Sequence, residues 1–219
     1  MTKLHGCIQM VFKEQTLSLH PYKAIYWNEL QTLLIADLHL GKIEHFRKKG
    51  FAVPQVAAQE NWDKLIGLFL LYQPQKVVFL GDLFHSNYNT AWEDFNSLLS
   101  TFSHITFTLV QGNHDILDAT LYQHSKISVI SEYLLPPFLL THEPLKNEHQ
   151  TYYNLSGHIH PCVVLEGLGH QKLKLPCFYF GQHQAILPAF GTFTGLATLS
   201  PRAQDKVYVI VEDKVLQAK

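Results

Sequence analysis

The sequence is poor in charged residues and in cysteine, and it has no long hydrophobic run. Charged residues make up 16% of the 219 positions, where soluble domains carry about 25%, which excludes a disordered chain or a charged tail. The three cysteines, Cys7, Cys162 and Cys177, are too scattered for a disulfide framework or a paired-cysteine zinc site. No apolar run approaches the roughly 18 residues of a membrane span, and the first residues lack the apolar core of a signal peptide. We therefore expect a cytoplasmic protein with no membrane contact.

The charge balance is nearly even, whereas histidine is abundant. Lys and Arg number 17 against 18 Asp and Glu, so no overall positive field attracts nucleic acid and any such site must be local. The 14 histidines point to metal binding or acid–base chemistry, because imidazole is the commonest metal ligand and titrates near neutral pH. The chain shows no repeat, linker or charge block, so residues 1–219 are expected to form one domain.

Short apolar runs predict many strands, and two longer segments keep helical spacing. Helices are expected over 54–72, with Pro54 in the first turn, and over 90–102, where Thr90 and Glu93 form a capping-box pattern. Strands are expected at 16–19, 24–27, 32–36, 76–80, 105–110, 128–130, 138–141, 153–156, 162–165, 177–180 and 207–211. The first half thus alternates strand and helix, and the second half is nearly all strand. This order predicts an α/β fold, a two-sheet β-sandwich flanked by helices in four α/β/β/α layers.

Polar side chains follow several of the predicted strands directly. Successive strands are followed by Asp37-Leu38-His39, Gly81-Asp82, Gly112-Asn113-His114-Asp115 and His142. Because sheets of α/β proteins place their ligand sites beyond the carboxyl ends of the strands, we expect these side chains to meet at one rim of the sheets.

The motifs differ in how specific they are. A His-x-His pair such as His158-Ile159-His160 is weak evidence, since about 0.9 such pairs are expected by chance among 14 histidines. A lone His142 is more often a hydrogen-bonded loop residue than a ligand. The tetrapeptide Gly112-Asn113-His114-Asp115 is strong evidence, because chance would produce it only about 0.001 times in this composition.

Taken in order, these motifs resemble those of a known enzyme family. The chain reads Asp37-x-His39, Gly81-Asp82, Gly112-Asn113-His114-Asp115, His142 and Gly157-His158-x-His160. This resembles the fingerprint of the calcineurin-like metallophosphoesterases: DxH, GD, GNH[DE], H and GHxH. The resemblance implies two divalent metal ions, which stabilise the apical oxygens of a phosphoester under attack and lower the pKa of a shared water. Asp, His and Asn suit Mn²⁺, Fe or Zn²⁺, and Mn²⁺ is expected.

The family pattern, carried over by position, implies a role for each motif residue. The first metal is assigned to Asp37, His39 and His160, the second to Asn113, His142 and His158, and Asp82 is expected to bridge both. His114 is implied to be the general acid that protonates the leaving oxygen, a role worth about 10²–10⁴-fold in rate. Asp115 is expected to anchor its loop rather than to touch substrate.

The chain departs from the family pattern at one position. Many members carry an Asp three residues after the bridging Asp, where it orients the catalytic His, and this chain has His85 there. His85 is expected either to take over that orientation or to reach the substrate phosphate.

Longer segments resemble one bacterial subfamily, the ligase-associated phosphodiesterases of the DNA-damage response. The similarity runs from Gln31 to Gly195 and includes 37–42, 81–86, 141–144, 156–161 and 187–195. It implies a Mn²⁺-dependent phosphodiesterase, a DNA endonuclease that acts in DNA repair on single-stranded or flapped DNA. Its implied partners are an ATP-dependent DNA ligase, a helicase and a nuclease.

The one basic cluster of the chain follows the first motif. Lys42, Arg47 and Lys48 lie in the segment 42–51, and are expected, with His85, to bind the phosphates that flank the scissile one. We interpret the segment as a flexible flap. A solvated start of a helix is an almost equally good interpretation.

Two other functions stay open. The same chemistry would serve a phosphodiesterase or pyrophosphohydrolase of a small nucleotide. A catalytically retired interaction scaffold would have lost a ligand or the general acid, and this chain keeps them all. The oligomeric state is also open, because 207–216 fits an internal strand and also an edge strand that pairs between subunits.

Overall fold

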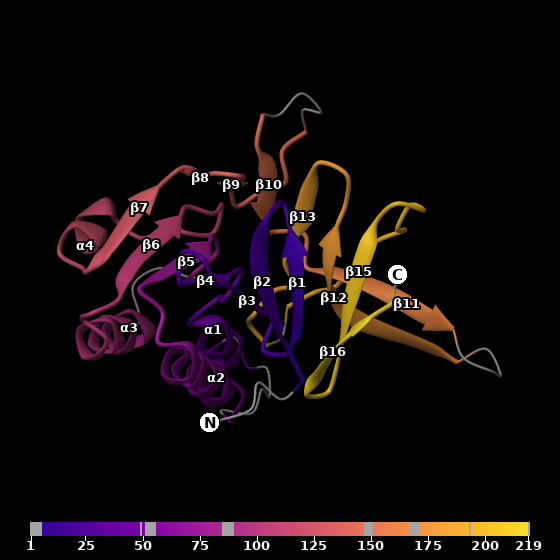
Figure 1. The fold of residues 1–219 in the computed structure, drawn as a ribbon. Helices are drawn as coiled ribbons and strands as arrows, with labels where there is room; N and C mark the ends of the chain where they lie inside the picture. The colour runs from indigo at the N-terminus through magenta and orange to yellow at the C-terminus, as the bar shows by residue number, and fades with distance from the viewer. Residues whose placement is uncertain are drawn as a thin grey trace.

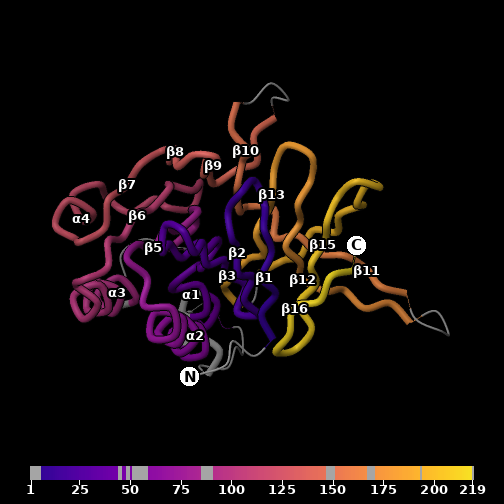
Figure 2. The backbone as a smooth tube through the Cα atoms, viewed as in Figure 1, coloured from indigo at the N-terminus to yellow at the C-terminus, as the bar shows by residue number. Residues whose placement is uncertain are grey.

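The chain folds into two β-sheets that pack face to face, as Figure 1 shows for the computed structural model and Figure 2 for its backbone trace. The structure describes residues 6–48, 50, 56–84, 90–146, 151–166, 171–192 and 194–218. The first half of the chain forms one sheet with its helices, and the second half forms the other sheet.

The first sheet has seven strands in the order of the chain. They are β1 (Ile8–Phe12), β2 (Gln15–His20), β3 (Ala24–Trp27), β4 (Thr32–Ile35), β5 (Lys76–Leu80), β6 (Thr106–Val110) and β7 (Ile127–Ile130). Strands β1 to β4 are antiparallel, whereas β4 to β7 run parallel, with Ile35 opposite Phe79. The parallel strands therefore end at one rim, and the residues that follow them emerge side by side.

The second sheet has nine strands, ordered β14-β11-β12-β13-β10-β9-β8, with β15 paired to β12 and β16 paired to β15. They are β8 (Tyr133–Leu135), β9 (Phe138–Leu140), β10 (Tyr153–Ser156), β11 (Pro161–Glu166), β12 (Lys172–Phe180), β13 (Gln184–Ile186), β14 (Ala197–Thr198), β15 (Lys206–Val211) and β16 (Lys214–Gln217). Strand β10 runs parallel to β9 and to β13, so its carboxyl end faces the same way as that of β9.

Alternation of side chains along the central strands produces two cores. On β4, Leu33 and Ile35 belong to the core beneath the helices, whereas Leu34 belongs to the core between the sheets, as the two-residue period of a strand requires. From the second sheet, Phe138 and Leu155 enter the same inter-sheet core, and both are fully buried. This apolar layer fixes the two rims relative to each other.

The helices cover the first sheet. They are α1 (Lys42–Lys48), α2 (Val56–Tyr72), α3 (Thr90–Thr101) and α4 (Ala119–Gln123). Leu68 of α2 and Phe95 of α3 are buried in the core that contains Leu33. The predicted two-sheet sandwich is confirmed, but the expected fourth layer is not seen, because no helix follows α4 among the residues that the structure describes.

The predicted strands and both predicted helices all fall on observed elements of the same type. The sequence missed the short elements β1, β8, β13, β14, β16 and α4, and it offered a helix over α1 only as an alternative. The segment 207–216 is a hairpin rather than one strand, with β15 held between β12 and β16. None of the helices in the described parts of the chain has the length and apolarity to span a bilayer.

Candidate metal centre

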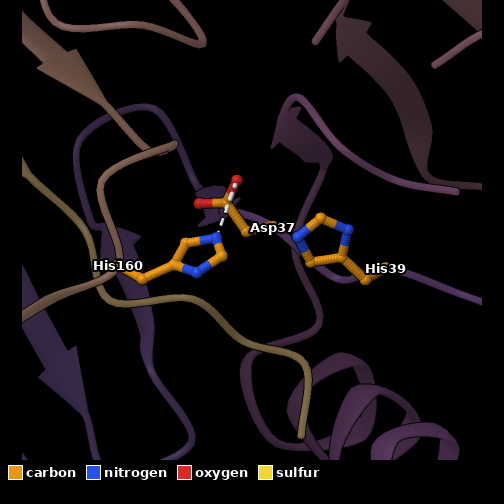
Figure 3. A group of neighbouring side chains, drawn as sticks. All are labelled: Asp37, His39 and His160. Atoms are coloured by element: carbon orange, nitrogen blue, oxygen red, sulfur yellow. Dashed lines mark ion pairs between the residues drawn. The ribbon is translucent and has the colours of Figure 1, made fainter. Parts of the chain in front are cut away.

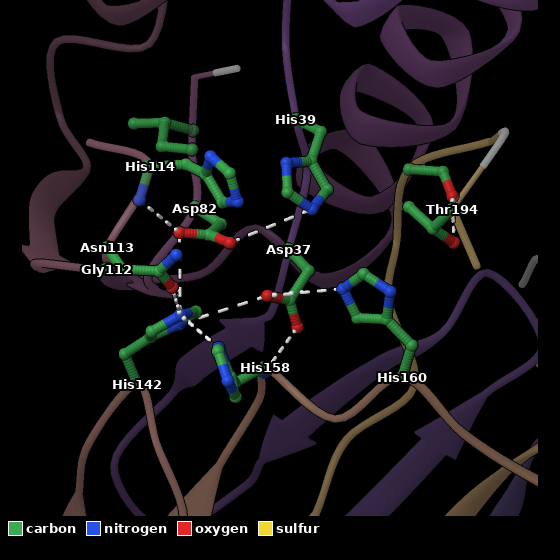
Figure 4. A network of polar contacts seen from close by, with 12 residues as sticks. Asp37, His39, Asp82, Gly112, Asn113, His114, His142, His158, His160 and Thr194 are labelled. Atoms are coloured by element: carbon green, nitrogen blue, oxygen red, sulfur yellow. Dashed lines mark hydrogen bonds and ion pairs between the residues drawn. The ribbon is translucent and has the colours of Figure 1, made fainter. Parts of the chain in front are cut away.

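The seven predicted metal ligands come together where the rims of the two sheets meet (Figure 4). Asp37 and His39 follow β4, Asp82 follows β5, Asn113 follows β6, His142 follows β9, and His158 and His160 follow β10. The structure thus gathers residues that are up to 123 positions apart in the sequence. Their roles as ligands remain predictions.

The first group of candidate ligands is Asp37, His39 and His160 (Figure 3). One ligand atom from each lies within 4.8 Å of the others. Asp37 and His39 are buried, and Nε2 of His160 lies 3.6 Å from Oδ1 of Asp37. A carboxylate and two imidazoles can therefore contact one ion at this point.

The second group is Asp82, His142 and His158, with Asn113 beside it. Nε2 of His142 lies 3.0 Å from Oδ1 of Asn113, 3.0 Å from Nδ1 of His158 and 3.4 Å from Oδ1 of Asp82. Four potential ligand atoms thus converge on one small volume.

Asp82 lies between the two groups. Its Oδ1 faces His142 at 3.4 Å, and its Oδ2 faces Nε2 of His39 at 3.8 Å. One carboxylate is therefore placed to contact an ion in each group, which is the geometry expected of a bridging ligand.

The donor set fits a pair of divalent cations. Oδ1 of Asp37 and Nε2 of His160 are buried, and neither has a hydrogen-bond partner in the described parts of the chain. Buried polar atoms are normally hydrogen-bonded, so such atoms facing one another indicate a site for an ion. Mixed carboxylate, imidazole and amide donors suit Mn²⁺, Fe or Zn²⁺, and the geometry does not distinguish among these metals.

Backbone carbonyls orient two of the imidazoles. Nδ1 of His142 lies 3.0 Å from the Leu80 carbonyl oxygen, and Nδ1 of His160 lies 3.1 Å from that of Gly195. Because a carbonyl only accepts, each Nδ1 carries the proton, and each Nε2 keeps its lone pair for a metal.

Five of the seven candidate ligands have a left-handed backbone. The φ angles are 53° for Asp37, 50° for His39, 48° for Asp82, 67° for His158 and 53° for His160. Residues other than glycine seldom adopt this region, and each pays about 1–2 kcal/mol for it. The fold accepts this strain because the turns aim the side chains into the centre.

Glycines in the motifs make room for these turns. A Cβ on Gly81, whose φ is +78°, would overlap the ring of His142, and a Cβ on Gly157 would come within 2.6 Å of Oδ2 of Asp37. The glycines of the GD and GHxH motifs are therefore required by the close packing of the ligands.

Asp115 anchors the loop that carries His114, as the sequence predicts. Its Oδ1 accepts hydrogen bonds from the backbone N–H groups of Leu83 at 2.8 Å and Phe84 at 3.2 Å, and its Oδ2 accepts one from Gly112 at 2.8 Å. Burial raises the pKa of Asp115 to about 6, although these hydrogen bonds oppose the shift. The carboxylate joins the loop after β5 to the loop after β6.

His114 lies at the exposed mouth of the centre. Its backbone N–H donates to Oδ1 of Asp82 at 2.9 Å, and its ring centroid lies 5.8 Å from that of His39. The imidazole therefore stands beside both groups of ligands, where a general acid for a bound phosphoester would have to stand.

The predicted substrate-binding residues are only partly described. Lys42 is half-buried at the first position of α1, and burial lowers its pKa while Asp82 and Asp37 oppose that shift. Arg47 is exposed on the same helix, the side chain of Lys48 is not described, and His85 lies outside the described residues. Residues 42–48 form a helix, so the expected flap is wrong there and the alternative of a helix start is the one observed. Four of the seven residues, the two Lys, the Glu and the Arg, are good helix formers.

The segment 187–195 has a role that the motifs alone do not reveal. The N–H of Phe190 donates to the Ala36 carbonyl at 2.8 Å, and that of Gly191 donates to the Asp37 carbonyl at 3.1 Å. Together with the contact between the Gly195 carbonyl and Nδ1 of His160, these hydrogen bonds hold the segment against the first group of ligands. Its only signal in the sequence was its place in the subfamily resemblance.

Comparisons with known proteins agree with this geometry. The family model described as calcineurin-like phosphoesterase matches residues 30–181. The crystal structure of Pseudomonas putida nuclease MPE is similar, with a TM-score of 0.78 and 29% identity over 96% of this chain and 99% of that one. A phosphoesterase from E. coli, Yfce, matches with a TM-score of 0.44 and 14% identity over 85% of this chain and 97% of that one. No curated protein sequence matches the chain.

Proposed function

The chain belongs to the calcineurin-like phosphoesterases, which are metal-dependent hydrolases of phosphoesters, and we propose that its substrate is a phosphodiester bond of DNA. The observation that carries the proposal is the similarity to the Pseudomonas putida nuclease, which spans 96% of the chain. The matched region contains all seven candidate ligands and His114.

In this proposal the candidate ligands hold two divalent ions. Asp37, His39 and His160 would hold the first, the second group would hold the other, and Asp82, which faces both groups, could serve both. When bound, such a pair supplies a nucleophile from water near neutral pH and stabilises charge on the phosphate oxygens. The chain contributes the spacing of the two groups and the orientation of each imidazole.

His114 protonates the leaving oxygen. A general acid must reach the departing atom directly or through one water. His114 is exposed beside both ligand groups, and its main chain is fixed by Asp82 while its loop is fixed by Asp115. The imidazole can thus approach a substrate that enters from solvent.

Lys42 and Arg47 guide the strand to the centre. Helix α1 begins three residues after His39, and Lys42 at its first position is attracted by Asp37 and Asp82. With ions bound to those carboxylates, the ammonium group is free to pair with a phosphate that flanks the scissile one. Lys48 and His85 are proposed to assist in the same way.

The cellular setting is part of the proposal. The subfamily resemblance supports Mn²⁺ as the metal, a cytoplasmic location, a role in DNA repair, and an ATP-dependent ligase, a helicase and a nuclease as partners. Free cysteines at Cys7, Cys162 and Cys177 agree with a reducing compartment.

The experiment is nicking of closed circular single-stranded DNA by the Mn²⁺-loaded protein, with bis-p-nitrophenyl phosphate as a simple diester. We expect wild type to cut the circle, and His114→Ala to cut it about 10²–10⁴-fold more slowly. The variant should lose less on the nitrophenyl ester, because that leaving group departs without a proton. The control is His104→Ala, an exposed histidine before β6, at the end of that strand remote from the centre.

Cleavage of the small diester without any cutting of DNA would refute the DNA substrate and leave the hydrolase intact. Equal DNA cleavage by wild type and His114→Ala would refute the role of His114 as the acid.

A further inference from the structure

A cavity separate from the metal centre lies at the end of β10 that is remote from that centre. It measures about 630 Å³ and lies among the segments 144–146, 181–184 and 200–205. The Asn154 side-chain oxygen accepts from Leu145 N–H at 3.1 Å, and Asn154 N–H donates to the His183 carbonyl at 3.1 Å. The cavity therefore borders the start of β10, whereas His158 follows its end. Its volume lies in the range of small-molecule sites, about 300–1,000 Å³.

Two cations, Lys146 and Arg202, line the cavity. Lys146 and Arg202 are exposed, and neither forms an ion pair with a residue that the structure describes. Lys64, by contrast, pairs with Glu60 at 2.6 Å, and Lys172 with Glu166 at 2.9 Å. The two cations of the cavity are therefore available to a ligand.

The one carboxylate in the described part of the lining, Asp205, has hydrogen-bond donors of its own. Asp205 is 4% exposed, and its Oδ2 accepts from the Tyr179 hydroxyl at 2.8 Å and from the Arg202 N–H at 2.6 Å. It holds the 200–205 loop against β12, and it forms no ion pair with the guanidinium group of Arg202. The other polar side chains of the described lining carry amide, hydroxyl and imidazole groups, which can donate hydrogen bonds to anionic oxygens.

A third cation, Lys13, lines a neighbouring cavity. A smaller cavity of about 80 Å³ shares Gln182 and His183 with the first and adds Lys13 and Tyr152. Lys13 comes from the turn between β1 and β2. Cations from three distant parts of the chain thus surround one turn, in a protein whose formal net charge is −1.

We propose that the groove formed by these two cavities, the 181–184 groove, is a second phosphate-binding site that holds the backbone of a nucleic-acid strand. This proposal rests on the proposed function. Lys and Arg bind phosphate oxygens through charge-assisted hydrogen bonds. His142 and Lys146 are four residues apart, so the chain between them spans at most about 14 Å. Single-strand sites cover about 4–16 nucleotides, so one strand can occupy the metal centre and the groove together.

The experiment compares two double variants that remove the same charge. Binding of a fluorescein-labelled single-stranded 20-mer is measured by anisotropy in a His114→Ala background, at several salt concentrations. One variant is Lys146→Ala/Arg202→Ala, and the control is Lys174→Ala/Lys214→Ala, two exposed lysines on β12 and β16 outside the groove. Thermal unfolding checks that each variant is folded.

We expect the groove variant to raise the Kd at least about 5-fold more than the control. Its slope of log K against log salt should also fall by about 1.4, because each lost phosphate contact on a single strand contributes about 0.7. Equal Kd values and slopes for the two double variants would overturn the proposal, even if wild type cuts DNA.

A second probe separates this proposal from the proposed function. Inorganic phosphate is titrated into wild type while the His183 ring is followed by NMR, with His183→Asn to assign its signal. If wild type binds no DNA and phosphate still shifts the His183 signal, the nucleic-acid strand is refuted and the groove is a site for free phosphates. If neither ligand binds, both the groove and the DNA substrate are refuted, and cleavage of the small diester then tests the metal centre alone.

Discussion

The backbone N–H of His158 donates a hydrogen bond of 2.8 Å to Oδ2 of Asp37, 121 positions earlier in the chain. Asp37 follows β4 of the first sheet, and His158 follows β10 of the second. The other oxygen of the same carboxylate faces His160 in the first ligand group. One side chain thus joins the two rims and belongs to the metal centre, so the centre is complete only when the sheets are packed together.

Substitution of Gly157 by alanine should damage this junction. The new Cβ would lie 2.6 Å from Oδ2 of Asp37 and 2.8 Å from Cβ of Ala36, so we expect a loss of about 1–3 kcal/mol in unfolding free energy and a loss of bound metal. The matched control is Gly67→Ala on α2, where a Cβ meets nothing within 4 Å and helix propensity favours alanine by about 1 kcal/mol. Urea unfolding and metal analysis check both variants. The unfolding free energy should fall in Gly157→Ala and rise in Gly67→Ala, and a fall in both variants would contradict the explanation.

Replacement of Asp115 by asparagine should loosen the loop that carries His114. The amide keeps one acceptor oxygen, so one of the two oxygens that bind Leu83, Phe84 and Gly112 is lost. An unsatisfied buried N–H costs about 1–3 kcal/mol, and kcat should fall because His114 is no longer held. Asp118→Asn is the control, since Asp118 caps α4 from an exposed position and Asn caps a helix equally well. Denaturation and steady-state kinetics give the comparison, and equal stability of the two variants would exclude the anchoring role.

Metal binding should stabilise the fold. Mn²⁺ at 100 times its Kd adds about 2.7 kcal/mol, which corresponds to a rise in Tm of about 5–10 °C for a chain of this size. Asp82→Asn removes the carboxylate that faces both ligand groups, yet keeps an acceptor for the His114 N–H, and should abolish most of the rise. Asp63→Asn on the exposed side of α2 should behave as wild type. Calorimetric scans with and without a chelator test this, and a full rise in Asp82→Asn would show that the residue is not a ligand.

A buried histidine outside the centre should make the fold sensitive to acid. Nδ1 of His20 accepts the Tyr22 N–H at 3.0 Å, and burial lowers the pKa of His20 to about 4, against about 6.5 in an unfolded chain. Between these pH values the unfolded chain binds a proton at His20 that the folded chain does not bind. The unfolding free energy therefore falls by on the order of 3 kcal/mol as the pH drops from about 6.5 to 4. His20→Asn keeps an acceptor and does not titrate, so its unfolding free energy should depend less on pH. His104→Asn, at an exposed site, should retain the wild-type profile; if all three profiles coincide, His20 is not responsible.

The sequence could name the candidate ligands because each motif is local and its residue types are rare together. Asp82 and His114 could be named because they stand in short blocks that follow apolar strands. What orients His142 and His160 could not be named, since the carbonyls of Leu80 and Gly195 carry no side-chain signal. The 181–184 groove could not be predicted for a related reason: Lys13, Lys146 and Arg202 are brought to the 181–184 turn only by tertiary packing.

The layers and the basic segment show the same limit. Periodicity in the sequence predicted the two long helices that cover the first sheet. The fourth layer was inferred from the fold class alone, and the described second half of the chain contains no helix that could form it. The segment 42–48 was interpreted by its charges as a flap, whereas the short-range hydrogen bonding of a helix governs its backbone.

The left-handed turns of the centre set the stability of the fold against its catalytic function during evolution. Glycine at His39, His158 or His160 would relieve about 1–2 kcal/mol of local strain at each position, and would delete a candidate ligand in the same step. A population selected only for survival at high temperature should therefore drift toward glycine at these three sites, and a population that must also hydrolyse its substrate should keep them. The stability that this fold could reach is limited by the turns that make it an enzyme.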